Sequence, residues 1–460
     1  MAASSPAALQ LAAPPLAERV RARAAGAWQA HRLTIVLATG LFVWLTLLGA
    51  LQPLTPDEAV YKIVSTGMLH GQWPYRDLFD HKPPLAYAWY VPMALGGSIE
   101  LQRALAASLL AASIPVFDSI ARRWLDGRAA TLATVSFALM LANPGLSVRA
   151  NLESFALLPL IAALAVPSPL AAGALLGIAA MTKPMALLFA PMLWFAWRRD
   201  AWKSALAMLA VCAAVSAPFM PIWRDYWTAN VTFNLEYGGA SAANRLRTLL
   251  TMPAPVFVGS LPLWCAAVGG ALRRPGARPW IFAACGLAAT KLSGQQFNHY
   301  YVLLLPPAAL FAGRSLDWAI DQWAGRAALA AGAVLALLPL AIGIGPLIRD
   351  YDRLHHPFGA AQSAIDATPG EFYMLGDHSQ PYVHAGRMPQ RRFFFDVPLV
   401  VRPEWGEQAR QDLLACPPAV LVTAEDRLFQ VAWRDEVTSL YAGRIETDGG
   451  TVYLDPVRHC

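Results

Sequence analysis

Residues 55–85 open with Thr-Pro-Asp-Glu at 55–58 and close with Asp-His-Lys-Pro-Pro-Leu at 80–85, directly after the first long apolar segment. Pro56 presets the first turn of a helix, so Asp57 and Glu58 fall where the helix dipole favours carboxylates. On capping preferences alone, the segment is a helix N-terminus in a loop. Whether its carboxylates also carry chemistry depends on what the rest of the chain places beside them.

The composition is that of a membrane protein. The chain has 460 residues, of which 56% are hydrophobic and only 14% charged, whereas about a quarter of the residues in an ordinary globular chain are charged. Apolar runs recur between residues 33 and 346, which predicts a mainly α-helical, multipass membrane protein. The net charge of +6 then indicates basic cytoplasmic loops rather than nucleic-acid binding.

The first predicted span is Leu33–Leu51, nineteen residues long, which is enough to cross ~30 Å of hydrocarbon. The Ala-, Pro- and Arg-rich residues 1–32 precede it. They are too long for a cleaved signal peptide and lack its small-residue cleavage site, so we expect a retained cytoplasmic tail. By the positive-inside rule, residues 52–100 then lie outside the membrane.

Further spans are predicted after this outer loop, at 101–121, 129–142, 152–166, 169–182, 184–197, 203–221, 252–271, 279–293, 299–313 and 326–346. Together with the first span they make eleven crossings. Within the outer loop, Leu85–Leu95 is apolar but too short to span, and its aromatic residues suit helices that lie at the membrane interface.

The distribution of cations tests this topology. If Leu85–Leu95 crossed the membrane, nearly every cluster of basic residues would lie outside, which the positive-inside rule rejects. With eleven crossings the clusters fall on the cytoplasmic side: Arg122, Arg123, Arg128, Arg198, Arg199, Lys203, Arg273, Arg274, Arg278, Arg314 and Arg326.

The composition changes after residue 346, and residues 347–460 carry ordinary charge. Strand-like runs at 372–375, 393–401 and 419–423 alternate with helical patterns such as 408–414, which predicts a small extracytoplasmic (periplasmic) α/β domain. The expected organisation is therefore a tail at 1–32, a transmembrane domain at 33–346 and an outer domain at 347–460.

The same topology gathers isolated polar residues on the outer face, near the ends of short spans. Such residues are costly to hold in hydrocarbon unless they line a cavity or meet a charged ligand. They come from separate loops: Asp57, Glu58, His81, Lys82, Arg149, Asn151, Glu153, Lys183, Arg224, Asn234, Glu236, Gln295, Gln296, His299 and Tyr300.

This set contains what the transfer of a sugar from a lipid phosphate requires. A carboxylate can deprotonate the acceptor, cations can hold the departing phosphate, and an apolar groove beside the short spans can take the lipid. We therefore predict Asp57 and Glu58 as catalytic carboxylates, and a donor-phosphate and substrate site of His81, Lys82, Arg149, Glu153, Lys183, His299 and Tyr300.

Simpler roles remain open for several of these residues. Lys82, before two prolines, can anchor the chain at the interface, and Lys183 can mark the end of a span. Arg149 and Glu153 are four apart and can pair on one helix. His299, with the two tyrosines that follow it, can belong to an aromatic belt.

The order of several short motifs resembles the GT-C membrane glycosyltransferases, in particular the protein O-mannosyltransferases and the lipid A aminoarabinose transferases. Each motif is weak alone, but their order and shared sidedness over about residues 33–313 make the likeness fairly specific. The motifs are Asp57-Glu58, Lys82-Pro-Pro-Leu85, Leu101-Gln-Arg-Ala-Leu105, the inner turn at 122–128, Arg149-Ala-Asn-Leu-Glu153-Ser-Phe155, Thr182-Lys183-Pro184 and Asn298-His299-Tyr300-Tyr301.

This resemblance implies a polyprenyl-phosphate-linked sugar donor, inversion at the anomeric carbon and Asp57 as the catalytic carboxylate. It also implies that Lys82 and His299 lie near the donor phosphate and that Glu153 occupies an acidic position of the second outer loop. The acceptor stays open as a lipid, a glycan or a protein. We expect an enzyme of the inner (plasma) membrane with its active site on the outer face, and the sequence indicates neither a cofactor nor a metal.

A lipid-linked sugar flippase or transporter is the main alternative. The sequence shows no inverted repeat and no polar residues strung through the middle of spans, which are features of transporters. A polymerase or ligase of lipid-linked glycans is a further alternative, but such enzymes usually lack an acidic pair directly after the first span. The sequence therefore favours a glycosyltransferase that uses a polyprenyl-phosphate-linked donor over a transporter and over a polymerase or ligase.

Overall fold

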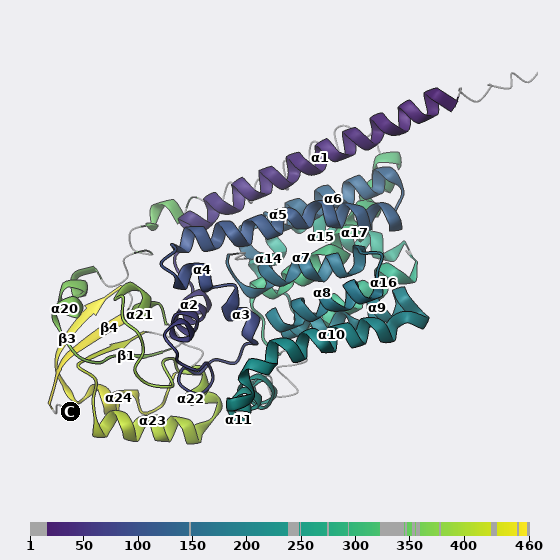
Figure 1. The fold of residues 1–460 in the computed structure, drawn as a ribbon. Coiled ribbons are helices and arrows are strands. Elements are labelled where there is room, and N and C mark those ends of the chain that lie inside the picture. Colours follow the sequence, from purple (N-terminus) through teal and green to yellow (C-terminus); the bar gives the residue numbers. More distant parts are fainter. Residues whose placement is uncertain are drawn as a thin grey trace, which may run out of the picture.

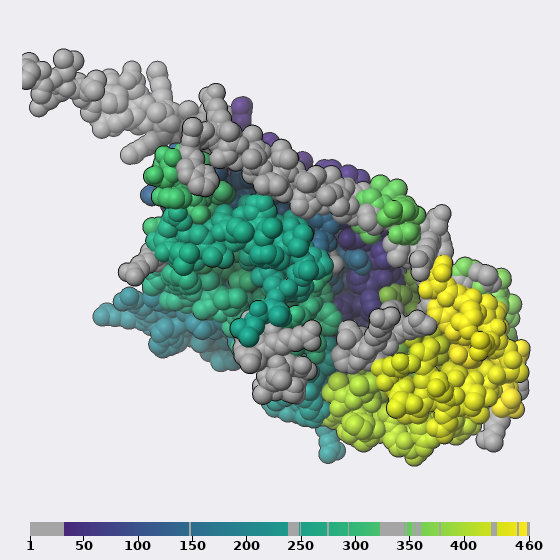
Figure 2. Space-filling view, turned by 180° about the vertical axis from the view of Figure 1, so that it is seen from behind, coloured from purple at the N-terminus to yellow at the C-terminus, as the bar shows by residue number. Residues whose placement is uncertain are grey.

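The structure is a computed structural model that describes residues 16–146, 149–237, 248, 250–273, 276–292, 294–322, 345, 347–351, 355, 359–376, 379–424, 430–448 and 450–457. It consists of a helical body and a smaller C-terminal lobe that contains a β-sheet (Figure 1). Seen from behind, the lobe lies against one end of the helical body (Figure 2).

Long helices run side by side through the body. α5 packs against α1, α6 and α7, α8 packs against α7 and α10, and α17 packs against α6 and α15. The helices of the body are α1 (Leu16–Leu51), α5 (Ile99–Trp124), α6 (Gly127–Leu141), α7 (Leu152–Ala165), α8 (Pro169–Thr182), α9 (Ala190–Trp197), α10 (Ala201–Ser216), α14 (Ala254–Val258), α15 (Leu261–Leu272), α16 (Ala277–Lys291) and α17 (Leu305–Gln322).

Most of the predicted spans coincide with these helices, but the predicted span 252–271 is divided into α14 and α15, and the predicted span 299–313 begins as a 3-10 turn before α17. Three segments, 32–51, 99–124 and 184–237, are long and apolar enough to cross a membrane, while 127–141, 152–165, 169–182 and 261–272 are shorter apolar helices. α1 begins at Leu16, within the predicted tail. The last predicted span, 326–346, lies almost wholly outside the described residues, so the number of eleven crossings stays a prediction.

Short helices form the outer loop and its surroundings. They are α2 (Pro56–Leu69), α3 (Pro84–Ala88), α4 (Val91–Ala94), α11 (Trp223–Trp227) and α12 (Phe233–Tyr237), with the 3-10 turns η2 (Pro184–Phe189), η4 (Ala217–Ile222) and η6 (Asn298–Leu304). The stretch Leu85–Leu95 is therefore covered by two short helices, and neither is long enough to span a bilayer.

The C-terminal lobe is an α/β unit, as predicted. Its sheet has the order β1-β2-β4-β3, with β1 parallel to β2 and the other neighbours antiparallel. The strands are β1 (Phe372–Leu375), β2 (Val420–Thr423), β3 (Tyr441–Thr447) and β4 (Gly450–Pro456), and the helices are α20 (Gln362–Ala367), α21 (Gln380–His384), α22 (Val397–Val401), α23 (Pro403–Ala415) and α24 (Arg434–Thr438).

One strand prediction in this lobe is wrong. The run Phe393–Val401 is an irregular segment followed by the short helix α22. Pro398 lacks the N–H that a sheet ladder needs, and the apolar side chains of the run are buried in the core that the lobe shares with the outer-loop helices. β3 and β4 were not predicted.

The lobe and the outer-loop helices are joined by one hydrophobic core that includes Phe79, Phe233 and Phe393. The Phe79 amide donates to the Arg392 carbonyl at 2.8 Å. Ion pairs join Arg392 to Asp225 at 3.1 Å and Arg402 to Glu236 at 2.6 Å. The lobe is therefore anchored through main-chain, ionic and apolar contacts to the same loops that carry the polar residues predicted for the site.

The topology makes a direct prediction about accessibility. In a protein without its native cysteines, an impermeant thiol reagent should label cysteines placed at the exposed positions Arg76 and Gln390 in intact cells. It should leave a cysteine at Arg199, which is equally exposed, unmodified until the cells are opened. Labelling of position 199 in intact cells would overturn the orientation.

Candidate active site

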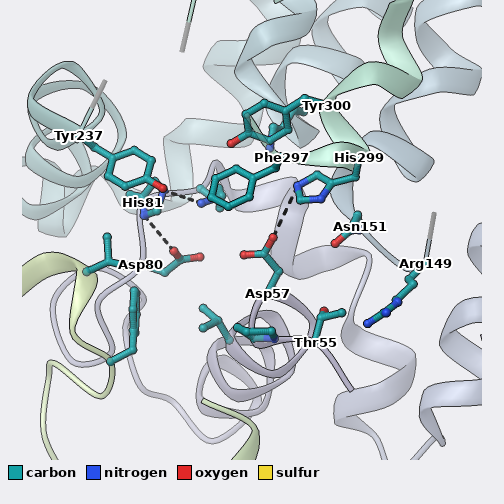
Figure 3. A pocket seen from close by; sticks show the side chains of 16 residues that line it. Thr55, Asp57, Asp80, His81, Arg149, Asn151, Tyr237, Phe297, His299 and Tyr300 are labelled. Carbon is teal, nitrogen blue, oxygen red and sulfur yellow. Dashed lines mark hydrogen bonds and ion pairs between the residues drawn. The ribbon is translucent and has the colours of Figure 1, made fainter. Parts of the chain in front are cut away.

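A cavity of about 250 Å³ lies where the outer-loop helices, the ends of the body helices and the C-terminal lobe meet. Its walls come from segments that are far apart in the sequence (Figure 3). The lining residues are Thr55, Pro56, Asp57, Val60, Asp80, His81, Lys82, Arg149, Asn151, Lys183, Tyr237, Phe297, His299, Tyr300, Phe395 and Val397.

The two adjacent carboxylates of α2 face different surroundings. Asp57 lines the cavity with 43% of its side chain exposed, and its carboxylate points toward His299, whose Nε2 lies 3.9 Å away (Figure 3). The Glu58 side chain is fully buried at 0% exposure and is not among the lining residues. Of the two predicted catalytic carboxylates, Asp57 is therefore accessible from the cavity and Glu58 is not.

Glu58 instead holds the start of α2 in place. Its carboxylate accepts from the backbone N–H of Thr55 at 3.0 Å, while the Thr55 hydroxyl accepts from the Glu58 N–H at 3.1 Å, which completes a capping box. Both of its oxygens also accept from Arg103 of α5, at 2.9 and 2.6 Å. Burial raises the pKa of Glu58, but the charge and hydrogen bonds of Arg103, the Arg149 charge and the Thr55 N–H together hold it below its usual value.

Three consecutive residues before α3 form a polar chain. The Asp80 carboxylate accepts from the Tyr87 hydroxyl at 3.0 Å and faces His81 Nδ1 at 3.3 Å. Burial, with the charges of Lys82 and Lys183, holds the pKa of His81 well below its usual range. The neutral ring can then accept at Nε2 from Lys82 Nζ, 2.5 Å away.

The backbone around Lys82 is held by two tyrosines. The hydroxyls of Tyr75 and Tyr87 donate to the Lys82 carbonyl at 2.9 and 3.2 Å. Tyr75 is fully buried and has φ +73°, a conformation that costs a non-glycine residue energy and persists only where the surroundings impose it. Lys82 is therefore set by a packed framework, which an interfacial anchor at a loop end would not need.

A second charge group lies on the other wall of the cavity. Lys183, at the end of α8, pairs with Glu153 of α7 at 2.7 Å, with side-chain exposures of 7% and 1%. His299 Nε2 lies 4.0 Å from the same carboxylate, and Lys183 Nζ lies 4.3 Å from the centre of the Tyr300 ring. The buried Glu153 carboxylate thus forms an ion pair with Lys183 and lies close to His299.

Arg149 has a different partner from the one that its spacing suggested. It precedes α7 and donates to the Gln52 side chain at 2.7 Å and to the Pro53 carbonyl at 3.1 Å. Glu153 pairs with Lys183, so the intrahelical pair with Arg149 is not formed. Burial lowers the pKa of Arg149 to about 10, which leaves it cationic at neutral pH.

All the predicted site residues therefore lie in or directly behind one cavity, with Glu58 and Glu153 in the supporting layer. The predicted site did not include the lining residues Thr55, Asp80, Tyr237 and Phe297, or Phe395 and Val397 of the lobe, and Asn151 was predicted only to lie on the outer face. Asp80 and Phe297 adjoin predicted residues, so proximity in sequence could have found them. No sequence signal marks the two lobe residues.

Within the part of the chain that the structure describes, no group of three or more His, Cys, Asp or Glu side chains is arranged to hold a metal ion. The charged side chains that line the cavity are three cations and two carboxylates, Asp57 and Asp80. Such an arrangement suits an anionic ligand flanked by a base.

Replacing Glu153 by glutamine should destabilise the protein by about 3 kcal/mol, because it leaves the buried Lys183 charge without its carboxylate. Thermal unfolding in detergent measures this. Glu446→Gln is the matched control, because its pair with Arg444 is exposed and surface pairs contribute about 1 kcal/mol or less. Equal stability of the two variants would contradict a structural role for the buried pair.

The comparisons with known proteins rest on structure. The sequence matches no protein-family model and no curated protein sequence. The fold is similar to that of ArnT from Cupriavidus metallidurans in the apo state, with TM-score 0.58 and 16% identity over 93% of this chain and 98% of that one. ArnT bound to undecaprenyl phosphate aligns with TM-score 0.56, 17% identity, and 93% and 97% coverage.

A more distant similarity is to the archaeal oligosaccharyltransferase AglB from Archaeoglobus fulgidus, in complex with an inhibitory peptide and a dolichol-phosphate. The TM-score is 0.52 and the identity 14%, over 91% of this chain and 74% of that one. At these identities the comparisons show a shared fold.

Proposed function

We propose that this chain, which has the GT-C fold expected from its motifs, transfers a sugar from a polyprenyl-phosphate-linked donor to a lipid, glycan or protein acceptor. The reaction takes place at the outer face of the inner membrane. The observation that carries the proposal is the solvent-open Asp57 in a cavity that Lys82, Arg149 and Lys183 also line. A base and an anion site thus face one space.

The reaction follows from this arrangement as an inverting displacement. Asp57 takes the proton of the acceptor as a bond forms between the acceptor atom and the anomeric carbon. The bond from that carbon to the phosphate oxygen breaks, and its electron pair leaves with the polyprenyl phosphate. The proton ends on Asp57 and is released to solvent, to which this side chain is open.

The cations stabilise the charge that develops on the leaving phosphate. Lys82 and Arg149 are the stronger candidates, because their hydrogen-bonding partners are neutral: the His81 ring for Lys82 and the Gln52 and Pro53 oxygens for Arg149. Lys183 is already paired with Glu153, so it contributes less net charge. Donors that are fixed in position before the reaction stabilise developing charge without the cost of reorganising.

Assays with a panel of donors test this proposal. The purified protein should transfer sugar from polyprenyl-phosphate donors and ignore nucleotide sugars, and shortening the lipid should weaken binding by roughly 0.8 kcal/mol for each buried CH₂ that is lost. Turnover with nucleotide sugars alone would refute the proposal. Movement of lipid across vesicles without transfer would support a flippase instead.

Transfer should survive chelation, since three cations surround the proposed phosphate position. The measurement is turnover before and after EDTA, followed by addition of Mg²⁺ or Mn²⁺. Loss of turnover on chelation and its return with metal would instead make Asp57 a metal ligand. This would also require a different role for the neighbouring cations.

A further inference from the structure

Two adjoining cavities lie at the end of the helical body opposite the candidate active site. α5 connects the two ends, because Arg103 contacts Glu58 near the site and Arg123 lines both distal cavities. Twenty residues of α-helix separate these arginines, a distance of about 30 Å. The cavities measure about 590 and 340 Å³.

The smaller cavity combines cations with an apolar wall. Arg123 of α5, Arg278 of α16 and Arg314 of α17 line it, and no acidic residue is among its described lining residues. The rest of the lining is largely apolar and aromatic: Trp124, Leu125, Phe195, Gly276, Ala277 and Pro279. Three positive charges from three helices thus share one small space.

The acids that line the larger cavity, Asp126, Asp317 and Asp321, form no ion pair with these three arginines among the described residues. Arg128 forms ion pairs with both Asp317 and Asp321. Among the described residues, no carboxylate lies within 4.0 Å of Arg278 or Arg314. Arg123 donates to the carbonyl of Ala165 at 2.6 Å. The smaller cavity therefore keeps its positive charge.

The geometry points to a binding site for the phosphate headgroup of an anionic phospholipid in the inner leaflet. The three positive arginines are complementary to a negatively charged phosphate, and the apolar wall beside them can contact an acyl chain attached to that phosphate. Trp194 and Trp280, on helices that line the cavity, are 70% and 47% exposed, and tryptophan at such helix ends is typical of the membrane interface. A lipid satisfies both features, whereas free phosphate uses the cations alone.

The test uses the purified full chain in detergent, with phosphatidylglycerol, phosphatidylcholine and inorganic phosphate as probes, and native mass spectrometry to measure retained lipid. Phosphatidylglycerol should be retained and phosphatidylcholine lost. Replacing Arg123, Arg278 and Arg314 together by glutamine should weaken phosphatidylglycerol binding about a hundredfold, at about fivefold for each arginine.

A charge-matched control removes three cations of the same face outside the cavity, Arg198, Arg199 and Lys203, and should change binding less than about threefold. Equal loss in both triple variants, or equal retention of the two lipids, would overturn the site. Displacement of phosphatidylglycerol by millimolar phosphate would overturn the lipid as the source. Lys82→Ala should still retain phosphatidylglycerol, and a loss there would place the lipid in the active-site cavity.

This inference does not depend on the proposed transferase activity, because its measurement is lipid retention at the opposite end of the body. A protein that transfers no sugar can still bind phosphatidylglycerol through these three arginines. Conversely, an active transferase whose glutamine variants retain the lipid unchanged would refute the inference alone.

Discussion

Transfer should fall by about 10²–10⁴-fold when Asp57 is replaced by asparagine, the range that a positioned general base contributes. Asparagine keeps the size and polarity of the side chain but cannot accept the acceptor's proton. Because the Asp57 side chain is 43% exposed and lies at the cavity rim, folding and donor binding should stay close to those of the natural protein. Single-turnover rates with saturating donor isolate the chemical step.

Glu58→Gln should have the opposite profile. It removes the charge that pairs with the buried Arg103, so it should lower thermal stability strongly, and its effect on transfer should follow from the loss of folded protein. Near-normal turnover in Asp57→Asn, together with a well-folded but inactive Glu58→Gln, would transfer the catalytic role to Glu58. The two variants thus separate chemistry from architecture at adjacent positions.

Donor binding should weaken by about 1.5–3 kcal/mol in Lys82→Ala, the contribution of a hydrogen bond to a charged group, or about 10–150-fold in Kd. The measurement is the Kd of a polyprenyl phosphate by calorimetry. Lys62→Ala is the matched control, because Lys62 lies on α2 but outside the cavity lining. Equal affinity of the two variants would remove Lys82 from the phosphate site.

The same lysine predicts how donor affinity depends on pH. Burial lowers the pKa of Lys82 from the usual 10.5, and the Asp80 and Asp57 charges oppose that shift only in part. The ammonium therefore loses its proton as the pH rises through a value below 10.5, so affinity should decline on the alkaline side. Lys82→Arg should move this decline to higher pH, and an unchanged profile would assign it to another group.

Two residues of the C-terminal lobe line the cavity and can therefore be substituted to test how an acceptor is selected. Phe395 and Val397 line the cavity, and their segment is fixed to the outer loop through the Phe79–Arg392 hydrogen bond. This part of the cavity wall thus belongs to the C-terminal lobe. Substitutions there are the natural place to look for altered acceptor choice.

The sequence by itself predicted a mainly helical membrane protein, and it located most of the described helices and grouped the site residues on one face. Hydropathy acts over a single span, and the positive-inside rule acts on each loop, so both can be read locally. The predicted membrane topology alone placed Lys82, Arg149 and His299 on the same face of the membrane. The structural similarity to ArnT shows that the chain shares the fold of that protein, as the resemblance in these motifs implied.

Only the tertiary structure separated the two carboxylates of α2. Asp57 and Glu58 are adjacent and chemically alike, but Glu58 is buried against Arg103, 45 residues later, whereas Asp57 lines the cavity. Likewise, the run 393–401 resembles a strand because its side chains are apolar, yet they are buried in a core that the lobe shares with the outer-loop helices. Contacts between distant segments decide such roles, and local sequence patterns do not encode them.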